Sequence, residues 1–144
     1  MIGSGKSSER AFLESVLEAG VTYIAERGYA SFEIIAKLLQ SHGYFVFRVK
    51  DNLLYDVQEV LSLASQELPK CFHQVRDEVV VFKNDGHHSR VRLVHFKVAG
   101  SYFRLLTNRF DLSPLQIINL YARAVANRVI FQVFEANFER VTFV

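Results

Sequence analysis

The chain has 144 residues, of which 50% are hydrophobic and 22% are charged, and it contains only two prolines. This composition predicts one globular domain over residues 1–144 and excludes a disordered or fibrous chain. The net charge of +2 is compatible with nucleic acid but does not require it, so any DNA contact would come from local clusters. The single cysteine, Cys71, excludes an internal disulfide and fits a reducing compartment. No apolar run reaches the roughly 18 residues of a membrane span, so we expect a cytoplasmic chain without membrane contact.

Residues 7–50 have the pattern of an α/β core. Ser7 or Ser8 can cap a first helix whose apolar residues, from Phe12 to Leu17, recur at helical spacing. Three further elements are predicted: a buried strand over residues 21–25, a helix over 32–42 and a second strand over 44–49. Strand, helix and strand with short loops form a βαβ unit, which predicts that the two strands are parallel.

Residues 51–108 are expected to form an insertion that consists mostly of antiparallel strands. Its first part combines a helical stretch around Leu53–Leu63 with a segment that contains Pro69. Three strands follow in the prediction, over residues 76–83, 90–98 and 102–107, with turns at 84–86 and 99–101. The alternation of side-chain types from Arg90 to Val98 has the period of two that is typical of a strand.

Residues 113–139 are predicted to form one long C-terminal helix. Ser113 can cap it, and Pro114 suits its first position because that position has no hydrogen-bonding partner for a backbone N–H. Apolar residues near helical spacing, among them Ile117, Ile118 and Val125, give this helix a face that can pack on the core.

Several familiar site patterns are excluded. Residues 3–7 read Gly-Ser-Gly-Lys-Ser, but a phosphate-binding loop needs an earlier glycine and a strand that leads into it. The five histidines and Cys71 show no spacing of a metal site. No Gly-x-Ser-x-Gly elbow is present, and neither Arg48-Val49-Lys50 nor Glu78 completes the acid and lysine pattern of a restriction-type nuclease.

Four segments occur in an informative order. Glu26-Arg27-Gly28-Tyr29 follows the first predicted strand, and Arg48-Val49-Lys50 ends the second. Leu106-Thr107-Asn108 follows the insertion, and Tyr121 lies in the predicted C-terminal helix. This order resembles the insertion-sequence DDE transposases that carry a β-strand insertion. In that family the corresponding segments are Asp-Arg-Gly-Tyr, Arg-x-Lys, Leu-Thr-Asn and a helix that opens at Tyr and carries the catalytic Glu. The resemblance covers residues 8 to about 121.

The resemblance implies a fold, a chemistry and a set of site residues. The fold would be α/β: a partial ribonuclease H-like core, made of a βαβ unit and a long C-terminal helix, with an antiparallel β insertion. The chemistry would be DNA transposition and recombination, by phosphodiester cleavage and strand transfer with Mg²⁺ or Mn²⁺. Glu26 takes the position of the family's second catalytic acid and metal ligand. The residues expected to contact the DNA at the ends of the mobile element are Arg27, Arg48, Lys50, Tyr121 and Arg123.

The sequence departs from the family pattern at the acids. Glu26 is one methylene longer than the expected Asp. An Arg and a Glu should lie three and seven residues after Tyr121, but those positions hold Ala124 and Arg128. A shift of one residue recovers Arg123 but puts Asn127 at the acid position, and Glu135 and Glu139 come about two and three turns too late. The strand with the first acid is expected before residue 1.

These departures lead to a hypothesis of a truncated or degenerate transposase catalytic domain that is inactive as this chain and binds no metal. The alternative is a non-catalytic module that binds DNA or an intact transposase and regulates it; a homodimer is a further possible partner. We also expect the C-terminal helix to pack near Glu26. Arg128 would then take the place of the metal as the counter-charge of Glu26.

Overall fold

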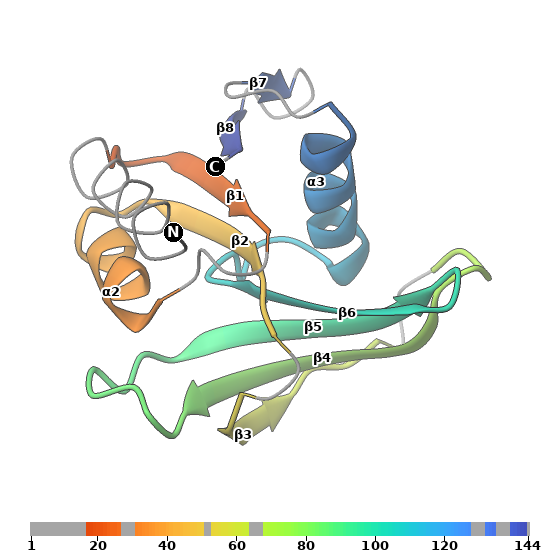
Figure 1. Ribbon diagram of the computed structural model, residues 1–144, viewed down its shortest axis with the longest axis horizontal. Coiled ribbons are helices and arrows are strands. Elements are labelled where there is room, and N and C mark those ends of the chain that lie inside the picture. Colours follow the sequence, from red (N-terminus) through yellow and green to blue (C-terminus); the bar gives the residue numbers. More distant parts are fainter. Residues whose placement is uncertain are drawn as a thin grey trace, which may run out of the picture.

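The computed structural model describes residues 17–26, 31–50, 53–63, 68–127, 132–134 and 139–143, and it describes side chains as far as residue 126. The helix expected from Ser7 to Leu17 therefore lies almost wholly outside the described residues. The described strands form one eight-stranded mixed sheet in the order β3-β4-β5-β6-β2-β1-β8-β7 (Figure 1).

The centre of the sheet is a βαβ unit. β1 (Val21–Ala25) and β2 (Tyr44–Arg48) pair in parallel, and α2 (Phe32–Gln40) connects them. All five residues of β1 are buried, as expected for a strand that is covered on both faces. The Ser31 hydroxyl accepts a hydrogen bond from the Ile34 amide (3.2 Å) and so fixes the start of α2. The predicted βαβ unit is confirmed.

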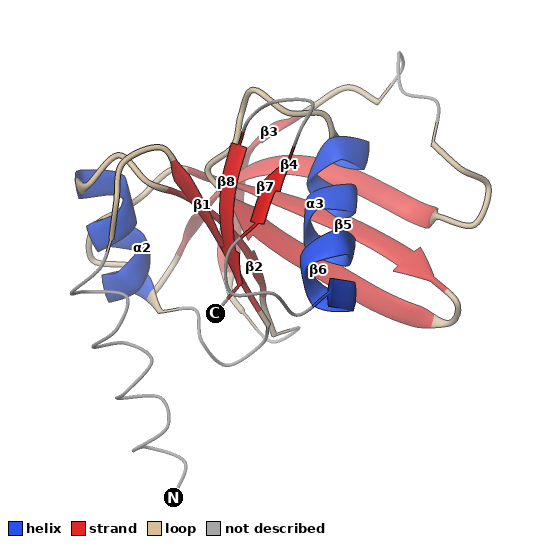
Figure 2. Cartoon of the chain, turned by 90° about the horizontal axis from the view of Figure 1, so that it is seen from above, coloured by secondary structure: helices blue, strands red, loops and turns tan. Residues whose placement is uncertain are grey.

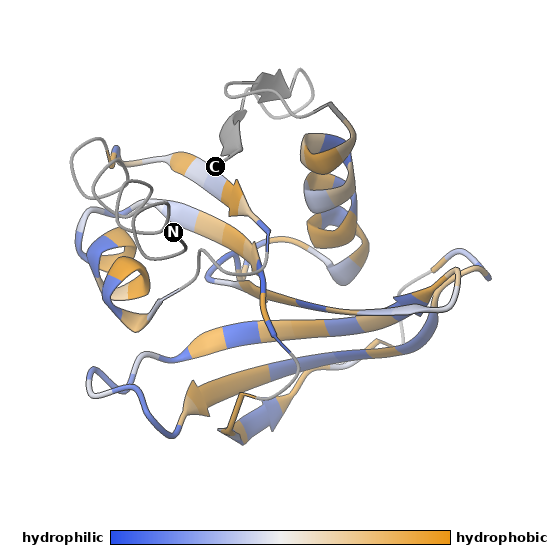
Figure 3. Cartoon of the chain, in the orientation of Figure 1, coloured by the Kyte–Doolittle hydropathy of each residue, from blue (hydrophilic) through white to orange (hydrophobic). Residues whose placement is uncertain are grey.

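The insertion consists of four antiparallel strands. These are β3 (Tyr55–Val60), β4 (His73–Phe82), β5 (Val91–Val98) and β6 (Ser101–Thr107). The last three confirm the predicted strands. In Figure 3 polar and apolar residues follow one another repeatedly along β5, whereas β4 ends in an apolar stretch. β6 also pairs antiparallel with β2, so the insertion continues the core sheet. The prediction of a helical stretch around Leu53–Leu63 was wrong. This segment contains β3, whose backbone pairs antiparallel with the ten-residue strand β4.

The C-terminal helix is shorter than predicted. α3 (Pro114–Asn127) begins at the predicted cap, where Ser113 and Gln116 exchange side-chain-to-backbone hydrogen bonds of 2.9 and 3.2 Å. The prediction that it continues to Glu139 was wrong, because β7 (Gln132–Phe134) and β8 (Glu139–Phe143) follow it. The apolar residues of this segment fit a strand as well as a helix, and pairing with β1 favours the strand.

α2 and α3 cover opposite faces of the sheet, as the view in Figure 2 shows. Two buried clusters result. The α2 side contains Val21, Tyr23, Ala25, Ile34, Ile35, Leu38, Phe45, Phe47, Val49, Val80, Phe82, Val91, Leu93 and Leu106. The α3 side contains Ile24, Val46, Val94, Phe96, Leu105, Ile117, Ile118, Leu120, Tyr121 and Ala124.

A buried ion pair connects the insertion to the loop before α3. The side chains of Arg92 on β5 and Asp77 on β4 are 3% and 2% exposed, and they form two hydrogen bonds of 2.7 and 2.6 Å. Nη1 of Arg92 also donates to the backbone oxygens of Arg109 and Leu112. These hydrogen bonds offset the free-energy cost of removing the Arg92 guanidinium from water, as a buried charge requires.

Arg109 extends this connection to β1. Its Nη1 donates to the Thr22 hydroxyl (2.8 Å), and its guanidinium lies 4.5 Å from the centre of the Tyr44 ring. It also forms two hydrogen bonds of 3.0 and 2.9 Å with the carboxylate of Asp111. These hydrogen bonds lower the pKa of Asp111 below its ordinary value.

A second buried polar pair lies on the other face of the insertion. Nε2 of His95, a residue with 0% exposure, donates to Oε1 of Glu78 (2.8 Å). Nδ1 then accepts from the Tyr102 hydroxyl (3.1 Å) and from Nη2 of Arg76 (3.4 Å). Burial, assisted by the charge of Arg76, lowers the pKa of His95 below its ordinary value of 6.5. The neutral imidazole is therefore the form that fits this site.

Substitution of Asp77 by alanine should lower the free energy of unfolding by about 3–5 kcal/mol, because Arg92 would remain buried without its counter-charge. Urea denaturation measures the change. The matched control is Asp56→Ala, which removes an exposed pair with Lys83 at 3.7 Å and should change stability by less than about 1 kcal/mol. Equal losses in the two variants would contradict the structural role given to Arg92.

Stability should also depend on pH through His95. The unfolded chain takes up a proton at a higher pH than the folded chain, so this contribution is complete above pH 6.5 and is lost as the pH falls through the lowered folded pKa. Urea midpoints from pH 8 to pH 5.5 should fall for the wild type and fall less for His95→Gln. Parallel pH curves for the two proteins would exclude His95 as the cause.

Candidate functional site

Two charged residues lie where the parallel strands end. Glu26 directly follows β1, and Arg48 is the last residue of β2. Ala25 and Phe47 are the last paired positions, so Glu26 and Arg48 come at the next step of the same parallel ladder. The carboxyl ends of parallel strands meet at one edge of a sheet, which is the edge where ligands bind in open α/β folds. Glu26 thus lies where the sequence predicted it, at the end of a central strand.

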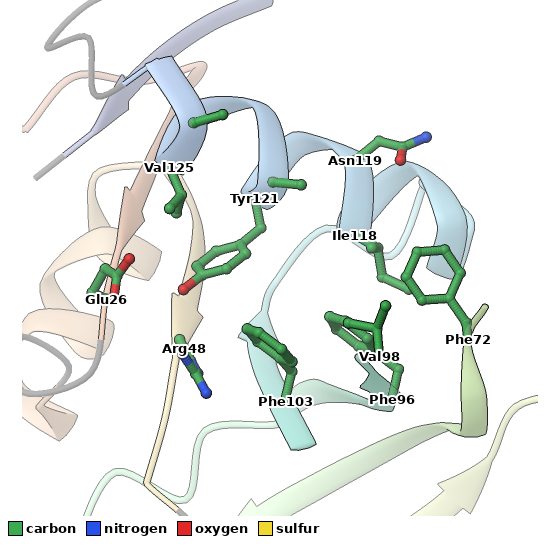
Figure 4. Close-up of a pocket in the computed structure, with 12 residues that line it drawn as sticks. Glu26, Arg48, Phe72, Phe96, Val98, Phe103, Ile118, Asn119, Tyr121 and Val125 are labelled. Carbon is green, nitrogen blue, oxygen red and sulfur yellow. The ribbon is translucent and has the colours of Figure 1, made fainter. Parts of the chain in front are cut away.

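A hollow of about 500 Å³ opens beside these strand ends, between α3 and the inserted strands (Figure 4). Its lining comes from the ends of β1 and β2, from the insertion and from one face of α3. The lining residues are Glu26, Arg48, Phe72, Phe96, Val98, Phe103, Ile118, Asn119, Tyr121, Ala122, Val125 and Ala126. The predicted packing of the C-terminal helix near Glu26 is therefore present.

Aromatic rings form most of the floor of this hollow. The rings of Phe96 and Phe103 are stacked, with centres 5.0 Å apart and planes at 4°. Phe72 meets Phe96 edge to face at 5.7 Å, and Tyr121 meets Phe103 in a similar way at 6.3 Å. The guanidinium of Arg48 lies 4.0 Å from the centre of the Phe103 ring. In Figure 4 the Arg48 side chain extends toward Phe103 and away from Glu26.

The other residues predicted to contact DNA are dispersed. Lys50 is exposed beyond the end of β2, and Arg123 is exposed on α3 but does not line the hollow. Tyr121 is only 4% exposed, so its ring belongs to the core and is not a surface contact. Arg27 lies outside the described residues.

Glu139, one of the two carboxylates that could have replaced the third acid, is not brought to Glu26. β8 runs parallel to β1 with Arg140 opposite Val21, so Glu139 lies level with the start of β1. At about 3.3 Å per residue, Glu139 is then roughly 20 Å along the strand from Glu26. Arg128 and Glu135 lie outside the described residues, so their positions relative to Glu26 stay predictions.

The donor set of the hollow does not fit a pair of metal ions. Among the described residues that line it, Glu26 is the only carboxylate and the other charged side chain is the cation Arg48. Hard divalent ions need several oxygen ligands at short distances, and a positive neighbour opposes their binding. Among the residues that the structure describes, no group of three or more His, Cys, Asp or Glu side chains could hold a metal ion.

The aromatic floor was not predicted from the sequence. Phe96 and Phe103 lie on neighbouring strands and pair directly across the β5–β6 ladder. Alternation places Phe96 and Val98 on one face, but the predicted three-residue turn at 99–101 would have put Phe103 opposite Lys97. The turn in the structure has only two residues, Ala99 and Gly100, and this register puts Phe103 opposite Phe96. The contribution of Phe72 had no such signal, because it comes from the segment before β4 that the sequence pattern did not assign.

The family model described as the transposase DDE domain matches residues 1–123. No curated protein and no solved structure matches the chain significantly. None of the described helices is long and apolar enough to cross a bilayer.

Proposed function

Because the chain belongs to the transposase DDE domain family, we propose that it is a degenerate catalytic domain that binds DNA but does not itself cut it. A transposition-related function and association with DNA follow from the family, whose members use divalent metal ions. The observation that carries the proposal of inactivity is the charge of the hollow. Glu26 supplies one carboxylate there, and Arg48 occupies the next strand end.

The charges argue against metal-dependent cleavage by this chain. Two-metal phosphodiester cleavage requires carboxylates that hold both ions close to the attacking and leaving oxygens. The described residues that line the hollow carry one negative and one positive side chain, so they do not supply the negative field that a pair of metal ions would need. Glu26 is also one methylene longer than the family's Asp, which would displace any ion that it held.

The C-terminal helix supports the same proposal. The position seven residues after Tyr121 holds Arg128, a cation where the family has its third acid. We propose that Arg128 faces Glu26 as its counter-charge. Such an exchange of metal for arginine would relieve the charge of a half-buried carboxylate.

A shift of the reading frame would explain this change. The family match ends at residue 123, although α3 continues to Asn127. Every valine codon begins with G. If the codon of Ala124 is GCG, its last two nucleotides and the first G of the Val125 codon form CGG, which encodes arginine. Likewise an arginine codon CGA or AGA before the G of the Val129 codon gives GAG, which encodes glutamate. The shifted frame could thus encode the family's Arg and Glu at positions 124 and 128.

We therefore expect the gene to have GCG at Ala124 and CGA or AGA at Arg128. Sequencing of the coding DNA is the measurement. Any other arginine codon at Arg128 cannot give glutamate in this frame, and it would show that the third acid was lost by substitution instead of a frameshift.

A second candidate function is a non-catalytic module that regulates an intact transposase by occupying its DNA. Arg48 at the sheet edge and the exposed Lys50 two residues later favour it, because two nearby cations can contact one DNA backbone. Duplex binding that weakens steeply with salt, without cleavage, is its expected signature.

The purified chain should not nick or join supercoiled plasmid DNA in Mg²⁺ or Mn²⁺, because Glu26 is the one acid among the described residues that line the hollow. Agarose gels of plasmid incubated with either metal measure this, and Glu26→Gln serves as the matched control. Metal-dependent nicking by the wild type that disappears in Glu26→Gln would refute the proposal of inactivity. Nicking that is equal in both proteins would indicate a contaminating nuclease.

A further inference from the structure

We propose that Phe103 is a positioning residue that holds the guanidinium of Arg48 at the sheet edge for a phosphate of duplex DNA. This inference rests on the proposed DNA binding and gives the β insertion a part in it. Phe103 belongs to the inserted strand β6, whereas Arg48 ends the core strand β2.

The contact joins residues that are not direct partners in the sheet. Arg48 is opposite Leu105 in the ladder, and Phe103 lies two residues before Leu105 in β6. The guanidinium of Arg48 reaches diagonally along β6 to lie 4.0 Å from the Phe103 ring centre, and Nη2 donates to the Tyr102 backbone oxygen (3.4 Å). Ring and carbonyl together fix both the plane and the direction of the guanidinium.

The ring itself is held from behind. Phe103 stacks on Phe96 at 5.0 Å, and Phe96 meets Phe72 at 5.7 Å, so three rings of the insertion form a continuous column. Tyr121 of α3 packs against Phe103 from the helix side at 6.3 Å. A ring fixed by neighbours on two sides is a firm platform for a cation, because little conformational freedom remains to be lost on binding.

Stacking also leaves Arg48 free to bind an anion. Glu26 directly follows the neighbouring strand β1, one step beyond its last pair with β2, so the two side chains could otherwise form an ion pair. The guanidinium carbon instead lies over the Phe103 ring, and the N–H donors of a guanidinium point outward in its own plane. Donors in that plane can take a phosphate in the bidentate manner that favours arginine over lysine.

Fluorescence anisotropy with a labelled 30-base-pair duplex of arbitrary sequence, titrated from low to moderate salt, tests the proposal. The proteins are the wild type, Phe103→Leu, Arg48→Gln and the double variant. Arg48→Gln should weaken binding and reduce the slope of log K against log salt by about 1. Phe103→Leu should weaken binding about 2- to 30-fold with Arg48 present and have no effect in the Arg48→Gln background.

Three further variants separate positioning from folding. Phe103→Tyr keeps the ring and should bind as the wild type does, while Phe103→Met fills the space without a ring and should behave like Phe103→Leu. Phe72→Leu changes a ring of the same column that does not touch Arg48, and it should bind nearly as the wild type does. Circular dichroism checks that each variant is folded. If Phe103→Leu does not fold, the DNA affinity of Phe103→Met decides whether the ring positions Arg48.

The possible failures differ from one another. A wild type that binds no duplex DNA overturns the proposed function and this inference with it. If the wild type binds DNA but Phe103→Leu lowers the affinity equally with and without the Arg48→Gln change, this inference alone is overturned. Tight binding by Phe103→Met has the same consequence, because a residue without a ring would then support Arg48 equally well.

Discussion

The Arg92 guanidinium joins three parts of the chain that are distant from one another in the sequence. It forms a bidentate pair with Asp77 and donates to the backbone oxygens of Arg109 and Leu112, so one buried cation joins β4, β5 and the loop that leads into α3. Such a charge is tolerated in a core only when all of these partners are in place. The loop therefore has little freedom, and α3 begins at Pro114 from a fixed point.

The hollow beside Glu26 depends on that fixed point. Arg109, held through its backbone oxygen by Arg92, also binds the hydroxyl of Thr22 on β1. The start of α3 is thus connected both to the insertion and to the central strand that ends at Glu26. Apolar packing then orients the helix, since Ile117 and Tyr121 belong to the buried cluster on this face. The polar links set where the helix starts, and the apolar face sets which side lines the hollow.

Local pattern was enough to predict the βαβ unit, the three long strands of the insertion and the cap of α3, because each has a period, a turn or a capping residue of its own. β3 and β8 were not predicted, since their pairing depends on edges that distant segments present: β3 pairs with β4, and β8 with β1. The position of Glu26 followed from the rule for parallel strand ends. The orientation of Arg48 did not, because its partner Phe103 is 55 residues away and lies diagonally across the ladder.

The pairing of β8 with β1 completes the core sheet from outside the segment that matches the family. β1 is wholly buried, and an outer edge without a partner would leave its backbone groups without hydrogen bonds. β8 supplies them from beyond residue 123, where the family match ends. A strand ladder uses backbone groups that every residue except proline has, so a segment with no inherited family pattern can still complete it if its residues favour strands, as Val141, Thr142 and Phe143 do. Metal binding makes the opposite demand: it requires particular carboxylates at particular positions, and a change at one of them removes the activity while the sheet remains intact.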